Sequence, residues 1–235
     1  MADQTERPVC PVWEEKIQNM KTDKMKGVIF DIDGVLLDSL SIWTDLGARY
    51  LKSKGREPEK GLAEKLFSMS MEQGAEYLAK EYSLGLDPGE VFDGLCDMLR
   101  DFYFYEVPAK TGSAKLIEGF KRDGLRITAA TSSPREYVVK ALSRNGLLDN
   151  FEKIFTSAET GSSKHSPKIY DDAASFMGTD PEETFVFEDS LYALKTAAAA
   201  GYITVGVFDA EGESDQEGMK ETAYIYLESL EDWNS

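Results

Sequence analysis

The sequence has 235 residues, of which 42% are hydrophobic and 29% charged, a composition typical of one large or two small globular domains. Its net charge is −17, and it has no basic stripe of the kind that nucleic acid requires. The single His165 excludes a histidine-rich metal site, and Cys10 and Cys96 are expected to be free thiols in a reducing compartment. Because no segment has the length of a membrane span or the apolar region of a signal peptide, we expect a cytoplasmic protein that binds neither nucleic acid nor membrane.

The first strong pattern lies at residues 27–39, which read G-V-I-F-D-I-D-G-V-L-L-D-S. The polar residues 1–24 before it are interpreted as an N-terminal extension. The apolar run at 28–30 predicts a buried strand that ends at Asp31, and Asp33 follows two residues later. Carboxylates in such a place are costly unless a cation or a chemical task requires them.

Residues 41–107 predict a succession of helices without a strand. The S-x-x-Q pattern at 70–73 predicts a capping box, and D-P-x-E at 87–90 predicts another helix start. Aromatic and apolar residues recur on single helix faces, and we expect most of them, including the aromatic run at 102–105, to pack in a core. The expected core positions include Trp43, Leu46, Tyr50, Leu51, Ala75 and Leu78.

From residue 108 onward, predicted helices and strands alternate. Strands are expected at 125–130, 151–155, 184–187, 203–207 and 224–227, and helices at 114–121, 134–146, 167–178 and 190–200. Residues 209–221 are interpreted as an acidic loop. The alternation predicts an α/β fold whose strands form a parallel sheet with right-handed crossovers.

Polar side chains follow three of the predicted strands, and a lysine follows a fourth. These residues are Asp31 with Asp33, Thr131 with Ser132, Glu188 with Asp189, and Lys164. Since open parallel sheets bind ligands at the carboxyl ends of their strands, we expect all of them at one edge. Carboxylates without His or Cys favour a hard cation such as Mg²⁺, and a cation beside a lysine and hydroxyls suits phosphoryl transfer with an aspartate nucleophile.

Each of these features also has an ordinary structural explanation. The hydroxyls could cap the helix that begins near Pro134, Lys164 could be a solvated loop residue, and the second acidic pair could lie at a helix N-terminus. A calcium-binding EF-hand loop is excluded, because Val35 stands where an oxygen ligand belongs. Four such coincidences in order, each at its expected strand end, favour a functional site.

The ordered motifs D-x-D-G-V-L-L-D-S, T-S-S, a loop lysine and F-E-D-S resemble the haloacid dehalogenase superfamily, in the branch with a helical cap inserted after the first motif. The resemblance covers residues 26 to about 230 and is greatest to the β-phosphoglucomutase and phosphoglycolate-phosphatase-like group. It implies a Rossmann-like α/β core formed by residues 25–40 and 108–235, with an all-helical cap at 41–107.

The resemblance implies a role for each residue of the set. Asp31 would be the nucleophile and Asp33 the general acid and base. Thr131 would hold the phosphoryl group with help from the Ser132 backbone. Lys164 would steady the negative charges of the nucleophile and the phosphate.

The same resemblance implies a Mg²⁺ site. Its ligands would be Asp31, the Asp33 carbonyl oxygen and Asp189, with Glu188 as a further ligand or as a partner of one. The presence of Asp33 also separates the chain from the dehalogenases of the superfamily, which lack this second aspartate and use no metal. Two departures, His165 after the loop lysine and Ala193 after the last motif, remove none of these groups.

The choice of reaction rests on what the cap lacks. Mutases of the group carry a cap histidine soon after the first motif, whereas residues 39–44 read S-L-S-I-W-T, and the loop at 66–71 has no arginine for a second phosphate. We therefore expect a Mg²⁺-dependent phosphatase that hydrolyses a small phosphorylated metabolite through an aspartyl phosphate, as a monomer or weak dimer. The first cap helix and residues 67–71 would contact the substrate. The alternatives are a sugar-phosphate mutase and a non-catalytic phosphate-binding module.

Overall fold

The computed structural model describes residues 24–233, which divide into two compact units. The core unit consists of the described residues up to Asp38 and from Ala109 onward, and the cap unit is Ser39–Pro108. Apart from Lys24, the predicted N-terminal extension lies outside the described residues. Among the described helices, none combines the length and the apolar composition that crossing a bilayer requires.

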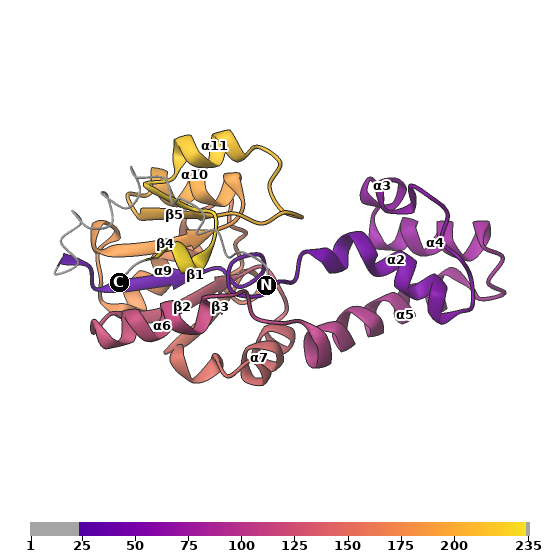
Figure 1. Ribbon diagram of the computed structural model, residues 1–235, viewed down its shortest axis with the longest axis horizontal. Coiled ribbons are helices and arrows are strands. Elements are labelled where there is room, and N and C mark those ends of the chain that lie inside the picture. Colours follow the sequence, from indigo (N-terminus) through magenta and orange to yellow (C-terminus); the bar gives the residue numbers. More distant parts are fainter. Residues whose placement is uncertain (1–23, 234–235) are drawn as a thin grey trace, which may run out of the picture. The chain divides into compact units, whose positions relative to one another are not determined.

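A six-stranded parallel sheet forms the centre of the core unit (Figure 1). Its strands are β1 (Gly27–Phe30), β2 (Arg126–Thr131), β3 (Lys153–Thr156), β4 (Thr184–Glu188), β5 (Ile203–Val207) and β6 (Ile225–Leu227). They lie in the order β3-β2-β1-β4-β5-β6, so that β1 is central and the chain order reverses beside it. The predicted α/β fold with a parallel sheet is confirmed.

Helices cover both faces of this sheet. They are α6 (Ser113–Arg122), α7 (Arg135–Arg144), α8 (Ser157–Thr160), α9 (Lys168–Met177), α10 (Leu191–Ala199) and α11 (Gln216–Thr222). Because side chains alternate along a strand, Ile29 and Val186 pack with α9 and α10 on one face. On the other face the Phe30 and Phe187 rings, 4.7 Å apart, pack against Phe120 of α6. The sheet is therefore buried between two layers, which explains its continuous apolar strands.

The prediction of an acidic loop at residues 209–221 is wrong for its second half, where α11 forms. The helix carries a single buried apolar residue, Met219, which packs with Leu194 of α10 and Tyr226 of β6. One apolar position produces no periodicity that a sequence pattern can reveal. The helix depends on tertiary packing instead.

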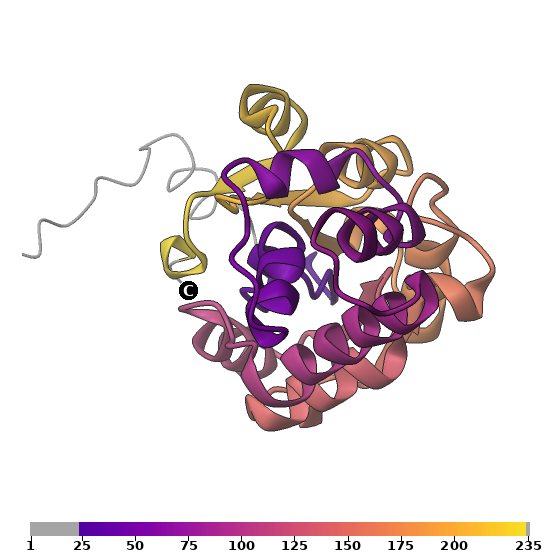
Figure 2. The ribbon, with the colours of Figure 1, turned by 90° about the vertical axis from the view of Figure 1, so that its right-hand side faces the viewer.

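The cap unit contains helices and connecting turns only (Figures 1 and 2). Its elements are α2 (Ser41–Ser53), α3 (Leu62–Phe67), α4 (Met71–Glu81), α5 (Pro88–Asp101) and a short π-helix, η2 (Phe102–Glu106). Both predicted helix starts are confirmed as capping boxes. The Ser70 hydroxyl accepts the Gln73 N–H, and the Asp87 carboxylate accepts the Glu90 N–H.

Most of the expected core positions of the cap unit are buried, but two aromatic residues are not. The buried ones are Leu46, Tyr50, Leu51, Ala75, Leu78, Phe102 and Tyr103. Trp43 is 52% exposed and Tyr105 is 70% exposed, so the expectation of burial was wrong for both. Trp43 lies in the first turn of α2 and borders a cavity. Tyr105 lies in the π-helix, whose turns are wider than those of an α-helix. Residues there therefore depart from the 3.6-residue period on which the expected burial was based.

The chain leaves the core unit for the cap unit, and returns to it, between two segments that pair with each other. Leu37 and Ala109 form an antiparallel bridge. The Leu36 carbonyl accepts the Lys110 N–H and the Ser113 hydroxyl, both at 2.9 Å. These bonds close the core at the base of the insertion.

Lys110 also joins the first motif to the end of β5. Its ammonium donates to the carbonyl oxygens of Gly34 at 2.6 Å and Phe208 at 2.9 Å, and lies 2.7 Å from the buried Asp209 carboxylate. Gly34 has φ of 71°, a conformation that favours glycine, so the turn after Asp33 has the residue type it requires. The lysine holds this turn in place.

Replacing Lys110 by Met should lower the free energy of unfolding by about 3 kcal/mol, because Asp209 would be left buried without a cation. Urea denaturation measures the change. Lys115→Met, at an exposed position of α6, is the control and should change stability by less than about 0.5 kcal/mol. Adding Asp209→Leu to Lys110→Met should restore part of the loss. Equal stability of the Lys110 and Lys115 variants would contradict the prediction.

Candidate active site

The register of the sheet brings the first and last motifs together at its carboxyl edge. Phe30 at the end of β1 pairs with Ala129 of β2 and with Phe187 of β4. The next residue, Asp31, donates its N–H to the Phe187 carbonyl at 2.9 Å and therefore lies beside Glu188. The two carboxylates meet although a long stretch of sequence separates them.

Lys164 lies between these two carboxylates. Its ammonium is 2.6 Å from Asp31 Oδ1 and 2.8 Å from Glu188 Oε1. Both lysine and glutamate are almost fully buried, with 2% and 0% of their surface exposed. Burial by itself would lower the pKa of Lys164, but the charges of Asp31 and Glu188 raise it overall, so the side chain remains an ammonium.

Glu188 has a second donor on the same oxygen. The Tyr170 hydroxyl, from the buried face of α9, donates to Glu188 Oε1 at 2.8 Å. The other oxygen, Oε2, is buried and has no hydrogen-bond partner among the described residues. A buried acceptor without a partner is costly, which indicates a ligand for Oε2.

A third carboxylate completes an acidic cluster. One oxygen each of Asp31, Glu188 and Asp189 lies within 4.8 Å of the others. Burial raises the pKa of Asp31 to about 8 and that of Asp189 to about 7, and burial also raises the pKa of Glu188. Were all three carboxylates ionised beside the one ammonium, two negative charges would remain, and the raised pKa values reflect how unfavourable that state is without a further cation. This all-oxygen donor set fits a hard divalent cation.

Asp33 has a hydrogen-bond donor outside that cluster. Ser133 donates its hydroxyl to Asp33 Oδ2 at 2.6 Å, while its N–H donates to Thr131 Oγ1 at 3.0 Å. Because Thr131 accepts this bond, its own hydroxyl proton stays available to a phosphoryl oxygen. The Ser132 hydroxyl lies 3.3 Å from that of Ser157 at the start of α8. The T-S-S motif is thus a hydrogen-bonded turn beside Asp33.

The loop that carries Lys164 is attached to the start of α10. The His165 ring stacks on the Tyr192 ring, with centroids 4.3 Å apart and an angle of 29° between the planes. Tyr192 lies in the first turn of the helix that follows Asp189. The single histidine therefore links the lysine loop to the acidic strand end.

Two residues of this site were missed by the sequence analysis. Tyr170 lies on the apolar face of α9 and looks like an ordinary core residue, so no pattern distinguishes it. Ser133 is the third residue of T-S-S, and its position directly after two candidate hydroxyls is a signal that could have suggested it. Both act on carboxylates that only the folded chain brings near them.

Comparison with known proteins gives a consistent result. The sequence model of the family described as haloacid dehalogenase-like hydrolase matches residues 28–207. A phosphorylated carbohydrates phosphatase of Thermotoga maritima is 26% identical over 178 residues, covering 75% of this chain and 82% of that protein. The bifunctional riboflavin kinase/FMN phosphatase of Arabidopsis thaliana is 25% identical, covering 77% of this chain and 48% of that protein.

A solved structure shows the same fold. It is the crystal structure of a putative β-phosphoglucomutase from Thermotoga maritima, with a TM-score of 0.79 and 23% identity. The match covers 89% of this chain and 97% of that one. At this identity the likeness concerns the fold alone.

Replacing Tyr170 by Phe should weaken Mg²⁺ binding by about tenfold, because Glu188 loses one of the two donors that orient it. Isothermal titration calorimetry measures the dissociation constant without any turnover. The control is Tyr202→Phe, which removes a similar hydroxyl bond, 2.8 Å long, to Asp171 in the same core. Equal Mg²⁺ affinity in the two variants would show that the Tyr170 hydroxyl has no effect on the metal site.

Proposed function

The chain belongs to the haloacid dehalogenase-like hydrolases and is a phosphatase, and we propose that it hydrolyses a small phosphorylated metabolite through an aspartyl phosphate on Asp31. The observation that supports this proposal best is the buried ammonium of Lys164 against Asp31 and Glu188 at the carboxyl edge of the sheet. Burial raises the pKa of Asp31 to about 8, and the charge of Lys164 opposes that rise and would also attract an anionic phosphoryl group.

Asp31 is suited to act as the nucleophile. Its Oδ1 accepts the Ile32 N–H at 2.8 Å and contacts the Lys164 ammonium at 2.6 Å. These donors fix the carboxylate and leave Oδ2 to attack phosphorus. A bond forms between Oδ2 and phosphorus as the bond from phosphorus to the ester oxygen breaks.

Asp33 is suited to move the proton in both steps. As a carboxylic acid it protonates the departing alkoxide, which leaves as an alcohol. As a carboxylate it then takes a proton from water, whose oxygen attacks phosphorus and releases phosphate and the Asp31 carboxylate. The Ser133 hydroxyl, 2.6 Å from Oδ2, orients the group for both transfers.

The remaining residues would bind the phosphoryl group and a metal. Thr131 and the Ser132 backbone would donate to phosphoryl oxygens. The cluster of Asp31, Glu188 and Asp189, together with the Asp33 carbonyl oxygen, would hold Mg²⁺. Bound there, the ion would offset the negative charge of the phosphate.

The relatives are named for phosphate esters with different organic groups. The Thermotoga protein is named for phosphorylated carbohydrates and the Arabidopsis protein for FMN. We therefore propose a small phosphate monoester as the substrate class. The chain's single histidine, His165, follows Lys164 rather than the first motif, which favours hydrolysis over the mutase reaction.

Replacing Asp31 by Asn should lower phosphate release from p-nitrophenyl phosphate by at least about 10³-fold, since no aspartyl phosphate can form. Chelation of metal by EDTA should also abolish turnover by the unaltered protein. The control is Asp38→Asn, which makes the same change at an exposed position of the first motif and should leave the rate near its original value. Retained activity in Asp31→Asn would refute the assignment of the nucleophile.

Replacing Ser133 by Ala should lower kcat about tenfold for esters of ordinary alcohols, because Asp33 is no longer oriented to protonate the leaving group. The effect should be smaller for p-nitrophenyl phosphate, whose leaving group needs little protonation. Ser143→Ala, at an exposed position of α7, serves as the control. Equal losses with both kinds of ester would show that Ser133 does not act through the proton transfer.

A further inference from the structure

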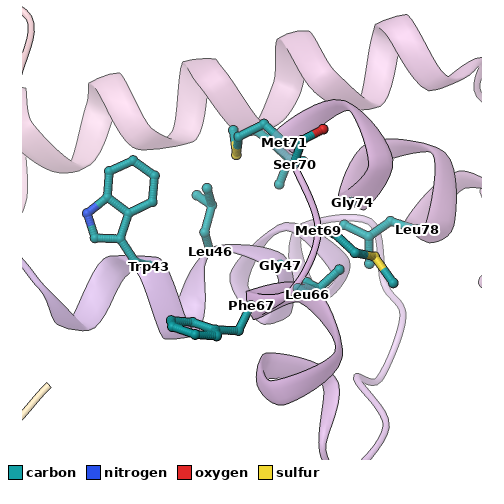
Figure 3. A pocket seen from close by; sticks show the side chains of 11 residues that line it. Trp43, Leu46, Gly47, Leu66, Phe67, Met69, Ser70, Met71, Gly74 and Leu78 are labelled. Carbon is teal, nitrogen blue, oxygen red and sulfur yellow. The ribbon is translucent and has the colours of Figure 1, made fainter. Parts of the chain in front are cut away.

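Exposed aromatic rings occur in both units, in different surroundings. In the cap unit, the exposed rings of Trp43 and Phe67 border a cavity of about 350 Å³ whose lining carries no charged side chain (Figure 3). In the core unit, Tyr192 is 42% exposed and stacks on the ring of His165, which is also exposed. Because His165 directly follows Lys164, this stacked pair belongs to the surroundings of the charged cluster.

The loop that carries Lys164 has few contacts that hold it against the sheet. In the described part of the chain, the hydrogen bonds of residues 161–166 remain within residues 156–168, apart from those of the Lys164 ammonium. Ser163 and His165, on either side of the buried lysine, are both exposed. The loop therefore needs a further contact if its backbone is to stay in one place.

The stack of His165 on Tyr192 supplies such a contact. The ring centroids are 4.3 Å apart, with 29° between the planes. Tyr192 lies in the first turn of α10, whose first N–H, that of Leu191, donates to Glu213 Oε2 at 3.1 Å. The same helix is anchored in the core unit by the buried Leu194. The tyrosine ring is thus carried by a fixed element, against which the neighbour of Lys164 can rest.

Tyr192 is also close to the charges that Lys164 contacts. Burial raises the pKa of the Tyr192 hydroxyl, the charge of Lys164 opposes this rise, and the charges of Glu188 and Asp31 add to it. The helix α10 begins soon after the strand end that carries Glu188. One short segment therefore positions a carboxylate and, through the stack, the ammonium that lies 2.8 Å from it.

The place of this ammonium needs to be fixed because its side chain is flexible and its contacts are short. It lies 2.6 Å from Asp31 Oδ1 and 2.8 Å from Glu188 Oε1, at the end of a flexible aliphatic stem. A displacement of about 1 Å at a reacting group can lower a rate by about 10²-fold. Without the stack, the ammonium would have to hold the loop by its own contacts, and an incoming phosphoryl group would compete for them.

We propose that His165 and Tyr192 are positioning residues of the hydrolysis, whose stacked rings hold the Lys164 ammonium between Asp31 and Glu188. The stack and its place follow from the geometry, whereas its effect on hydrolysis rests on the proposed function. Because the contact between the rings is what holds the loop, another aromatic ring at residue 165 should serve equally well. A pair that only stabilised the fold would change the free energy of unfolding without changing the placement of Lys164.

The first measurement follows the protection of Lys164 and requires no turnover. Acetic anhydride modifies lysines according to their accessibility, and mass spectrometry gives the rate at Lys164 relative to that at the exposed Lys115. In His165→Ala this relative rate should rise about tenfold, because the ammonium leaves its carboxylate partners more often. His165→Phe, which keeps a ring, should retain the protection. Phe176→Ala, which removes a similarly exposed ring from its contact with Phe155, should leave the protection unchanged.

The second measurement is kcat for p-nitrophenyl phosphate in the presence of Mg²⁺. His165→Ala and Tyr192→Leu should each lower it about tenfold. The double variant should lose no more than either single variant, since the two rings act as one unit. His165→Phe and the control Phe176→Ala should keep kcat within about twofold of its original value.

Unchanged acetylation and unchanged kcat in His165→Ala would overturn the proposal. A change in acetylation alone would show that the stack holds the loop without serving the reaction, and a change in kcat alone would show that it does not act through Lys164; either result would also overturn it. So would a loss that His165→Phe shares, because the imidazole and not the stacking would then be responsible. If the unaltered protein does not hydrolyse the ester, the proposed function fails, and acetylation still decides whether the stack holds Lys164.

Discussion

The ammonium of Lys164 between Asp31 and Glu188 is the interaction on which the rest of the site depends. It is buried, and so are both partners, so that removing Lys164 would leave two buried carboxylates without a cation. Even with the lysine in place, the pKa values of the three clustered carboxyl groups are raised, and one oxygen of Glu188 has no hydrogen-bond partner among the described residues. These two features support the proposal that a divalent cation binds at this place together with the phosphoryl group.

The parallel sheet positions that interaction, and the insertion of the cap unit does not disturb it. Asp31 and Glu188 are neighbours because β1 and β4 pair in register, whereas Lys164 reaches them from a loop beyond the edge strand β3. The chain leaves and re-enters the core at one point, where Leu37 and Ala109 pair and Lys110 holds the turn after Asp33. A helical unit can therefore be inserted next to the first motif while the turn keeps its conformation.

The two units provide opposite chemical environments. The core unit collects charges at a sheet edge and holds them with the hydroxyls of Tyr170 and Ser133. The cap unit offers an uncharged cavity bordered by Trp43 and Phe67.

The sequence by itself determined the parts that depend on local patterns. The apolar run before Asp31, the capping boxes at Ser70 and Asp87, and the polar strand ends are all readable along the chain, and they predicted the α/β class and the residues brought to one edge. Tertiary structure alone decided the Tyr170 bond to Glu188, the helix α11 and the exposure of Trp43. The physical reason is distance along the chain: Ser133 and Asp33, for example, are 100 residues apart, and only the packed sheet makes their hydrogen bond possible.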